Sequence, residues 1–343
     1  MTTERQKQSI GNLLRRPEAG AFVGMLVVYA FFVIFGGINF VSAGGTASWL
    51  NVASEIGIVA LPIGLLMIAG ELDISIGSVI PAASMTVAVI SGHLGAPLIV
   101  GVTAALMLGL LIGFINGLVV LRTGVPSLIV TLGSLFVVAG LTLGITVLVA
   151  GSTGVPIKAD PLGKALLGQF FGSSLGFGDV FETTILWWAL AIVIVGFVLH
   201  FSPYGNWIFA MGGDKLSARN AGIPTERLTI FMFMYSSFSA AFVGIAQAIL
   251  YNQAQVSAGQ SFIFNSIISV VIGGVLLTGG FGSVAGIVFG TMTFAIVNQG
   301  IFYTGFNANW ASLIIGLLLL AAVLLNNTFR KMALSAPSVK AKA

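Results

Sequence analysis

The sequence predicts an all-α integral membrane protein with about ten transmembrane helices and both termini in the cytoplasm. Only 7% of its 343 residues are charged, 57% are hydrophobic, and the mean hydropathy is +1.08. A soluble domain carries about 25% charged residues. This chain has too few charges to cover a water-facing surface and must be solvated mostly by lipid. The 45 glycines agree, because membrane helices associate through small residues.

Ten apolar runs approach the length of about 20 residues that a helix needs to cross the hydrocarbon core. We expect helices rather than strands, since isolated strands would leave backbone groups unpaired in lipid. The runs are 20–40, 48–69, 74–93, 96–120, 126–149, 183–202, 229–251, 263–279, 284–303 and 310–327.

The first run could be confused with a secretory signal. Arg15 and Arg16 precede it, and Val41-Ser42-Ala43 loosely resembles a cleavage site. The apolar run is longer than a typical signal core, and further hydrophobic helices follow. We therefore expect an uncleaved first helix.

The basic residues determine the orientation. With ten helices and the N-terminus inside, 12 of the 14 basic residues fall in cytoplasmic segments, and only Lys158 and Lys164 fall outside, in a loop over about 150–182. Such a bias selects this orientation. It also explains the net charge of +4 without nucleic acid, because the basic residues lie at the ends of apolar runs.

This count divides the chain into three parts. They are a cytoplasmic N-terminal tail (1–19), one transmembrane permease domain (20–328) that contains a cytoplasmic loop (203–228), and a cytoplasmic C-terminal tail (329–343). Gly77-Ser78-Val79 and Gly282-Ser283-Val284 each lie at an inner turn, as in transporters built from two repeated halves. Because only three residues are shared, a chance similarity explains them as well as an internal repeat does.

The 203–228 loop is the only long inner loop and the most charged part of the chain. Gly212-Gly213 breaks the chain, Asp214 can cap a helix, and Lys215 to Asn220 gives about two turns before Gly222 and Pro224 stop it. A short helix outside the membrane can transmit force from a soluble partner. The alternative is an ordinary solvated loop.

Two acidic residues interrupt the apolar sequence in GELDISIGSVIP, residues 70–81. Ionisable groups in such positions are costly and usually functional. Asp73 is well placed to cap the next helix through the N–H groups of Ser75 and Ile76, and lining the pathway is its other reading. Glu71 has no comparable structural role, although cytoplasmic water could solvate it.

Glu55 lies inside the second run, inward of Trp49, and Asn51 and Ser54 share its helical face. Pro62 frees a backbone carbonyl further along. This polar stripe favours a helix that lines a wet cavity. The alternative is a structural hydrogen bond between packed helices.

Neutral amides also lie inside the runs. Amides both donate and accept, which suits a polyhydroxyl solute, whereas for any single residue a contact between helices is the simpler explanation. They are Asn116, Gln247, Asn265, Asn298 and Gln299.

Several absences limit the function. The sequence has no GxxxxGK[ST] phosphate loop, so the chain does not hydrolyse ATP by that route. It has no cysteine and two histidines, so we expect no metal site, no cofactor and no catalytic residue.

Three stretches, GELDISIGSVIP, YGNWIFAMGGDKLSARNAGI and VIGGVLLTGGFGSVAGIVFGTM, resemble the sugar-type permeases of bacterial ABC importers, such as ribose, xylose and arabinose permeases. The resemblance covers about 45 to 328, with the motifs in the same order and spacing. It implies a non-enzymatic subunit of the bacterial inner membrane that pairs with a second permease subunit, identical or not. It further implies two cytoplasmic ATPase subunits and a periplasmic solute-binding protein.

By this resemblance, Lys215–Gly222 is the coupling helix, and Asp73, Ser75, Gly77 and Ser78 lie beside the translocation path. Two departures occur: Glu71 replaces a usually neutral residue and Asp214 replaces an Asn. The expected coupling residues are Gly212, Gly213, Asp214, Lys215, Ala218, Arg219 and Gly222. The expected pathway residues are Glu55, Glu71, Asp73, Ser75, Gly77, Ser78, Asn116, Gln247, Asn265 and Asn298.

Two other functions remain open. The first is a secondary transporter that uses Glu55 as the proton- or sodium-coupling carboxylate. The second is a passive channel, which needs no coupling helix. The solute itself is not identified; pentoses, hexoses, polyols and sugar-derived signals all fit.

Overall fold

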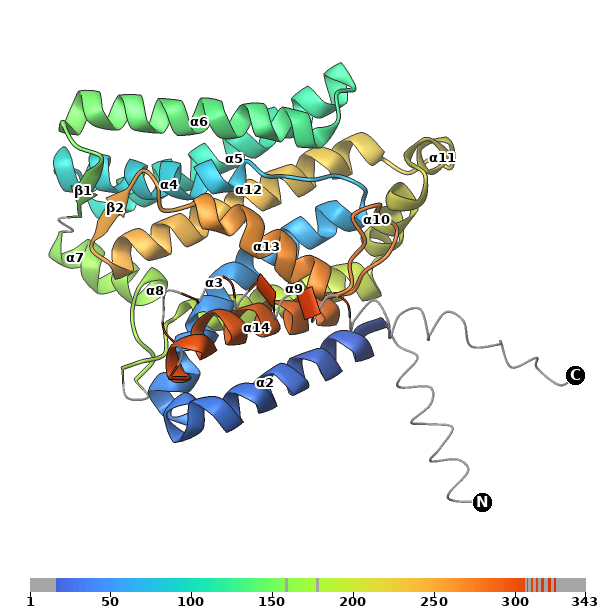
Figure 1. Cartoon of the computed structure of the whole chain (residues 1–343). Coiled ribbons are helices and arrows are strands. Elements are labelled where there is room, and N and C mark those ends of the chain that lie inside the picture. Colours follow the sequence, from blue (N-terminus) through green and yellow to red (C-terminus); the bar gives the residue numbers. More distant parts are fainter. Residues whose placement is uncertain are drawn as a thin grey trace, which may run out of the picture.

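The computed structural model describes residues 17–157, 160–176 and 179–305, together with scattered residues between 307 and 324. Long helices lie side by side as a bundle (Figure 1). In the described part of the chain, eight helices are long and apolar enough to cross a membrane. They are α2 (Pro17–Val41), α3 (Ala43–Ile68), α4 (Ile76–Val87) with its π-helical continuation η1 (Ala88–His93), α5 (Leu98–Thr123), α6 (Ser127–Ala150), α9 (Thr184–Phe201), α12 (Thr225–Leu250) and α14 (Val284–Gly300) with η3 (Ile301–Tyr303).

The eighth predicted span is wrong in its extent. In place of a helix over 263–279, α13 (Gln260–Ile272) has 13 residues, and no helix covers 273–283. The consecutive glycines Gly273-Gly274 end α13, and Gly274 takes a φ of 88°, which a side chain would oppose. The tenth predicted span (310–327), residues 1–16 of the predicted N-terminal tail and the whole predicted C-terminal tail (329–343) lie outside the continuously described residues.

Short elements close one end of the bundle. They are β1 (Gly154–Pro156), α7 (Pro161–Gly163), η2 (Lys164–Gly168), α8 (Gln169–Phe171) and β2 (Gln253–Gln255). β1 pairs antiparallel with β2, Val155 opposite Ala254. The opposite end carries α10 (Pro203–Gly213) and α11 (Lys215–Asn220) (Figure 1). The positive-inside bias predicts that the α10–α11 end is cytoplasmic and that the end with the β1–β2 sheet is external.

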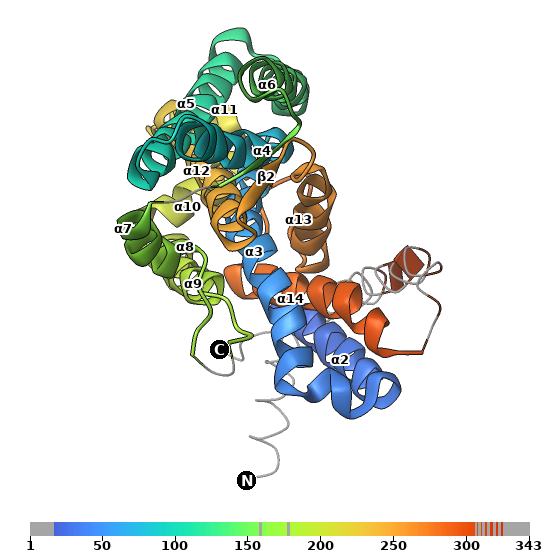
Figure 2. The same ribbon diagram turned by 90° about the vertical axis from the view of Figure 1, so that its left-hand side faces the viewer.

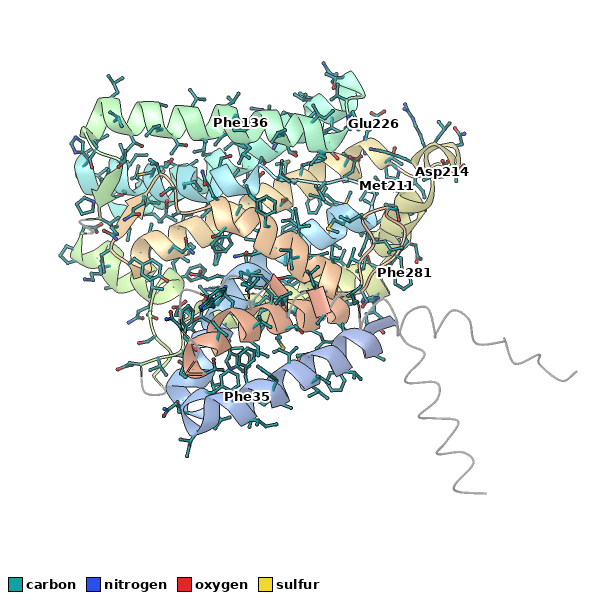
Figure 3. The ribbon with its side chains drawn as sticks, in the orientation of Figure 1. Phe35, Phe136, Met211, Asp214, Glu226 and Phe281 are labelled. Carbon is teal, nitrogen blue, oxygen red and sulfur yellow. The ribbon has the colours of Figure 1, made fainter. Side chains whose placement is uncertain are left out.

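Helix α3 is the central helix. Viewed along the bundle, it lies between a layer that contains α4, α5 and α6 and a layer that contains α2 and α14 (Figure 2). Every residue of α3 from Ala53 to Ile68 is buried, and the helix passes Pro62 without ending. At the periphery, α6 buries only Ser127, Thr131 and Thr146, and Phe136 projects outward from it (Figure 3). An apolar helix whose outer side chains are exposed is expected where lipid solvates that side.

Small residues bring α5 and α12 close together. Gly109, Gly113 and Gly117 follow each other at intervals of four and face α12. A Cβ on Gly113 would lie 2.6 Å from the Cα of Met234, closer than real Cβ atoms come to backbone. The glycines of α6 differ, since a Cβ on Gly140 would meet nothing within 4 Å. Glycine is therefore required at the α5–α12 contact and not on the outer helix.

Candidate functional site

The predicted coupling helix forms where the sequence indicated. Asp214 caps α11, its Oδ1 accepting from the N–H of Ser217 at 2.6 Å, and the hydrogen bonds from Ser217 hold the pKa of this carboxyl below its ordinary value. Gly222 follows with a φ of 86°, which ends the segment. Figure 3 shows Asp214 at the far end of the bundle.

The rest of the 203–228 loop is more ordered than predicted. Residues 203–213 form the helix α10, which starts at Pro203, a favoured first helical residue, and α12 already begins at Thr225. The expected break at Gly212-Gly213 comes directly after the two glycines, because α10 continues through both and Asp214 is its C-cap.

Gly212 is the point where the coupling segment meets the membrane core. It lies against the carbonyl of Ile68 at the end of α3 and against the N–H of Gly280, and the Gly280 N–H donates to the Ile68 carbonyl at 2.8 Å. Gly279 approaches Gly70 in the same place. We call Ile68, Gly70, Gly212, Gly279 and Gly280 the glycine junction. It joins α10 to the chain breaks that follow α3 and precede α14.

An ion pair reinforces this junction. Nζ of Lys215, the first residue of α11, lies 2.5 Å from Oε1 of Glu71, and the Glu71 side chain is only 11% exposed. The structure thus brings Glu71, a predicted pathway residue, to the coupling segment. The pairing gives a structural role to the acidic residue that departs from the family pattern.

The outer face of α11 presents side chains to the cytoplasm. Ala218 is buried, whereas Leu216, two residues earlier, is 68% exposed. Arg219 pairs with Glu226 at 3.1 Å, and both side chains are mostly exposed. Sequence reasoning missed Leu216; the signal was a large apolar residue in the most charged loop, on the helical face opposite a small buried one.

Asp73 anchors a buried network between α4 and α5. Its Oδ1 accepts from the N–H of Ser75 at 3.0 Å and from the Ser75 hydroxyl at 2.6 Å, and Nδ2 of Asn116 donates to that hydroxyl at 2.9 Å. The expected bond from Ser75 forms, but Asp73 precedes the helix by three residues, so it shapes the turn that enters α4. The predicted pathway residues Asp73, Ser75 and Asn116 therefore meet.

Helix α6 clamps the same turn. Ser127 Oγ accepts from the N–H of Leu72 at 3.0 Å, and Thr131 Oγ1 accepts from the N–H of Ile74 at 3.3 Å. Both hydroxyls are buried on an otherwise exposed helix. Sequence reasoning missed them; their spacing of four residues at the start of a helix was the available signal.

Gly77 and Ser78 lie within the first turns of α4. A Cβ on Gly77 would clash with Ile263 of α13, and Ser78 Oγ donates to the Ser75 carbonyl at 2.8 Å. Gly77 thus permits a close crossing of α4 and α13. The matching residues Gly282-Ser283-Val284 sit earlier in their helix, with Ser283 as N-cap of α14, so the internal repeat remains a prediction.

Glu55 is buried in α3 and joins α12. Its Oε2 accepts from Nε2 of Gln247 at 2.8 Å, and its Oε1 has no hydrogen-bond partner. The rest of the predicted polar stripe is structural, because Asn51 bonds the backbone of Val180 and Glu182, and Ser54 bonds Thr184 at 2.8 Å.

The two remaining predicted amides lie on other helices than Glu55 and Gln247. Asn265 is half-buried on α13, and Asn298 is half-buried on α14, where its Oδ1 accepts from Gln299. The described contacts therefore form two groups of predicted residues, Asp73–Ser75–Asn116 and Glu55–Gln247, and leave Asn265 and Asn298 outside both.

Known proteins are similar to this chain in sequence. The family model of the branched-chain amino acid transport system permease component matches residues 45–323. A fructose import permease from Rhizobium meliloti is 31% identical over 90% of this chain and 84% of its own length. A ribose import permease from Haemophilus influenzae is 26% identical over 95% of this chain and 98% of its own, and an autoinducer 2 import permease from Photorhabdus laumondii is 28% identical over 78% of each. No solved structure matches this chain significantly.

The match of the family model extends from the second span almost to the end of the tenth predicted one, and the similar permeases are aligned over most of their length. Such permeases are transport components and not enzymes. The chain belongs to this permease family and is a multi-pass inner-membrane component of an ABC import system.

Proposed function

We propose that this chain is the transmembrane subunit of an ABC importer that carries a sugar or a sugar-like polyhydroxyl solute into the cell. Two such subunits form the pore, two separate ATPase subunits supply the energy, and a periplasmic binding protein delivers the solute. The relatives support the solute class, since their names specify fructose, ribose and autoinducer 2 import.

The observation that carries the ATPase coupling is the glycine junction. A helix that only connects two spans would need no tight contact with the core. Gly212 instead lies against both Ile68 and Gly280, and Lys215 is paired with Glu71. A displacement of α11 is therefore passed on to the chain breaks beside α3 and α14 as a movement of packed backbone, which behaves as one body.

Docking of the ATPase uses the exposed face of α11. Leu216 provides an apolar side chain that would be covered by a groove of the motor, and Arg219 provides a charge at the rim. When the ATPase subunits close on ATP, α11 moves with them and the pore switches from outward to inward access.

The experiment is transport in proteoliposomes that contain this chain and the ATPase and binding protein encoded beside it. Leu216→Asp and Arg219→Glu should weaken ATPase binding and slow ATP-driven uptake, while the folded yield stays unchanged because both side chains are exposed. Thr153→Asp, an equally exposed change at the opposite end of the bundle, is the matched control. Normal ATPase binding and uptake in both docking variants would disprove the coupling role.

The same proteoliposomes separate the other functions. Uptake that continues with an uncoupler present at constant ATP excludes coupling to a proton gradient through Glu55. Uptake that requires hydrolysable ATP excludes a passive channel.

A further inference from the structure

A cavity at the external end of the bundle is lined by amides and hydroxyls. Its volume is about 390 Å³, in the range of small-molecule sites. It is bounded by α4, by the end of α12, by β2 and by the start of α13. The lining residues with polar side chains are Ser84, Gln247, Tyr251, Gln253, Gln255 and Ser261.

The lining carries no charged side chain, and Ala248, Ala254, Ala258 and Phe262 complete it. A zwitterionic amino acid would need counter-charges for its ammonium and carboxylate groups, because burying an unpaired charge is costly. A neutral polyol needs donors and acceptors in alternation, which amides provide from one side chain. An aromatic ring such as that of Phe262 can cover the apolar face of a sugar ring.

The two-stranded sheet places two of the amides. Gln253 and Gln255 belong to β2, which pairs with Pro156 and Gly154 of β1, and side chains two residues apart on a strand share a face. Both are exposed whereas Ala254 between them is buried. The small sheet therefore holds two glutamine amides together at the cavity edge.

Glu55 fixes the third amide. Nε2 of Gln247 donates to Oε2 of Glu55 at 2.8 Å, so the NH₂ group of Gln247 faces Glu55. The carbonyl oxygen of Gln247 is then an acceptor of known orientation. Without Glu55, the amide could turn and exchange its donor and acceptor ends.

We propose that this cavity is an external binding site for a neutral monosaccharide, that Gln247, Gln253 and Gln255 bind its hydroxyl groups, and that Glu55 is a positioning residue for Gln247. The proposal rests on the proposed function, from which it takes the direction of transport. It is more specific than the proposed function, since it assigns a binding site and excludes amino acids as ligands of that site.

The native chain has no cysteine, so one introduced thiol can be labelled without background. Ala258→Cys, at an exposed lining position with no proposed contact to the sugar hydroxyls, is treated in right-side-out vesicles with a membrane-impermeant thiosulfonate in the presence of D-fructose, D-ribose, D-glucose or L-leucine. At least one of the sugars should slow labelling by the factor 1 + [L]/Kd, and L-leucine should not. Thr153→Cys, exposed on the same external turn but outside the lining, should be labelled at one rate throughout.

Variants added to Ala258→Cys test the positioning role. Gln247→Leu and Glu55→Ala should weaken protection by the sugar, whereas Glu55→Gln, which can still accept a hydrogen bond, should retain more of it. Gln260→Leu, an exposed amide outside the lining, should have no effect. The labelling rate without sugar reports whether a variant has only distorted the structure, and it should stay constant.

The outcomes separate the two proposals. ATP-driven sugar uptake without protection by any of the three sugars would overturn the binding site and leave the function intact. Protection by L-leucine instead of sugars would overturn both the solute class and the site. Failure of ATP-driven uptake of every sugar, with protection present, would count against the function alone.

Discussion

The glycine junction yields the most direct test of how the cytoplasmic segment is attached. Gly212 and Gly213 are adjacent and both belong to the last turn of α10, but their surroundings differ. A Cβ on Gly212 would lie 2.9 Å from the carbonyl carbon of Ile68 and closer still to its oxygen and to the Gly280 nitrogen, below the 3.0 Å that real Cβ atoms respect. A Cβ on Gly213 would meet nothing within 4 Å.

Gly212→Ala must therefore push α10 away from α3 or break the Gly280–Ile68 hydrogen bond. The atoms it meets are backbone, which cannot rotate aside. Overpacking costs about 1–3 kcal/mol and a lost buried hydrogen bond about 1 kcal/mol more, so we expect a total of about 3 kcal/mol. For a chain of 343 residues, whose entropy of unfolding is about 0.7 kcal/mol/K, that lowers the melting temperature by about 4 °C. Gly213→Ala should be neutral or slightly stabilising, since alanine is the better helix former.

The measurement is the melting temperature of each purified variant in detergent, taken from the monodisperse size-exclusion peak that survives heating, together with ATP-driven uptake. Gly212→Ala should lose uptake at temperatures where it is still folded, because its α10 no longer lies against the chain breaks. Equal melting temperatures and equal uptake in the two variants would refute the junction as the mechanical contact.

Three further predictions concern packing, the ion pair and pH. Gly113→Ala should lower the melting temperature by opening the α5–α12 contact, whereas Gly140→Ala on the bare helix α6 should not; equal effects would contradict close packing as the reason for the glycine. Glu71→Lys and Lys215→Glu should each reduce uptake and the double exchange should restore part of it, with a coupling energy of about 1 kcal/mol because Lys215 is partly exposed. Burial raises the folded-state pKa of Glu182 above its ordinary value of 4.5, so this carboxyl group destabilises the fold increasingly as the pH rises from about 4.5 to that raised value, and fully above it. Glu182→Gln should therefore raise the melting temperature at neutral pH and lose this advantage below about pH 4.5; a gain that did not depend on pH would show that burial of charge is not the cause.

The helices that could be predicted from the sequence are those whose signal is local. A run of about 20 apolar residues cannot be solvated except by lipid, so the predicted runs from α2 to α12 appear in the structure with small shifts of their ends. The capped helix α11 was predictable for a similar reason, because Asp214 and Gly222 act on backbone groups within a few residues of themselves.

The prediction failed for α13, where length and hydropathy gave no weight to paired glycines. Gly273 lies so close to Gly286 that a Cβ could not fit, and the chain leaves the helix there. This close approach involves α14, which begins 11 residues later, and a pattern of apolar residues contains no information about it.

The roles of the polar residues divide in the same way. The sequence by itself determined that this chain is a membrane protein and that it lacks a phosphate loop, and it predicted that the basic loops face the cytoplasm. Each of these depends only on which residues are present and at what spacing. Which carboxylate meets which partner was decided by tertiary packing. Glu71 pairs with Lys215, 144 positions away in the sequence, and Glu55 accepts a hydrogen bond from Gln247, 192 positions away. Both contacts form because segments distant in sequence meet at those points. A buried acidic group is stable only where such a contact provides a donor.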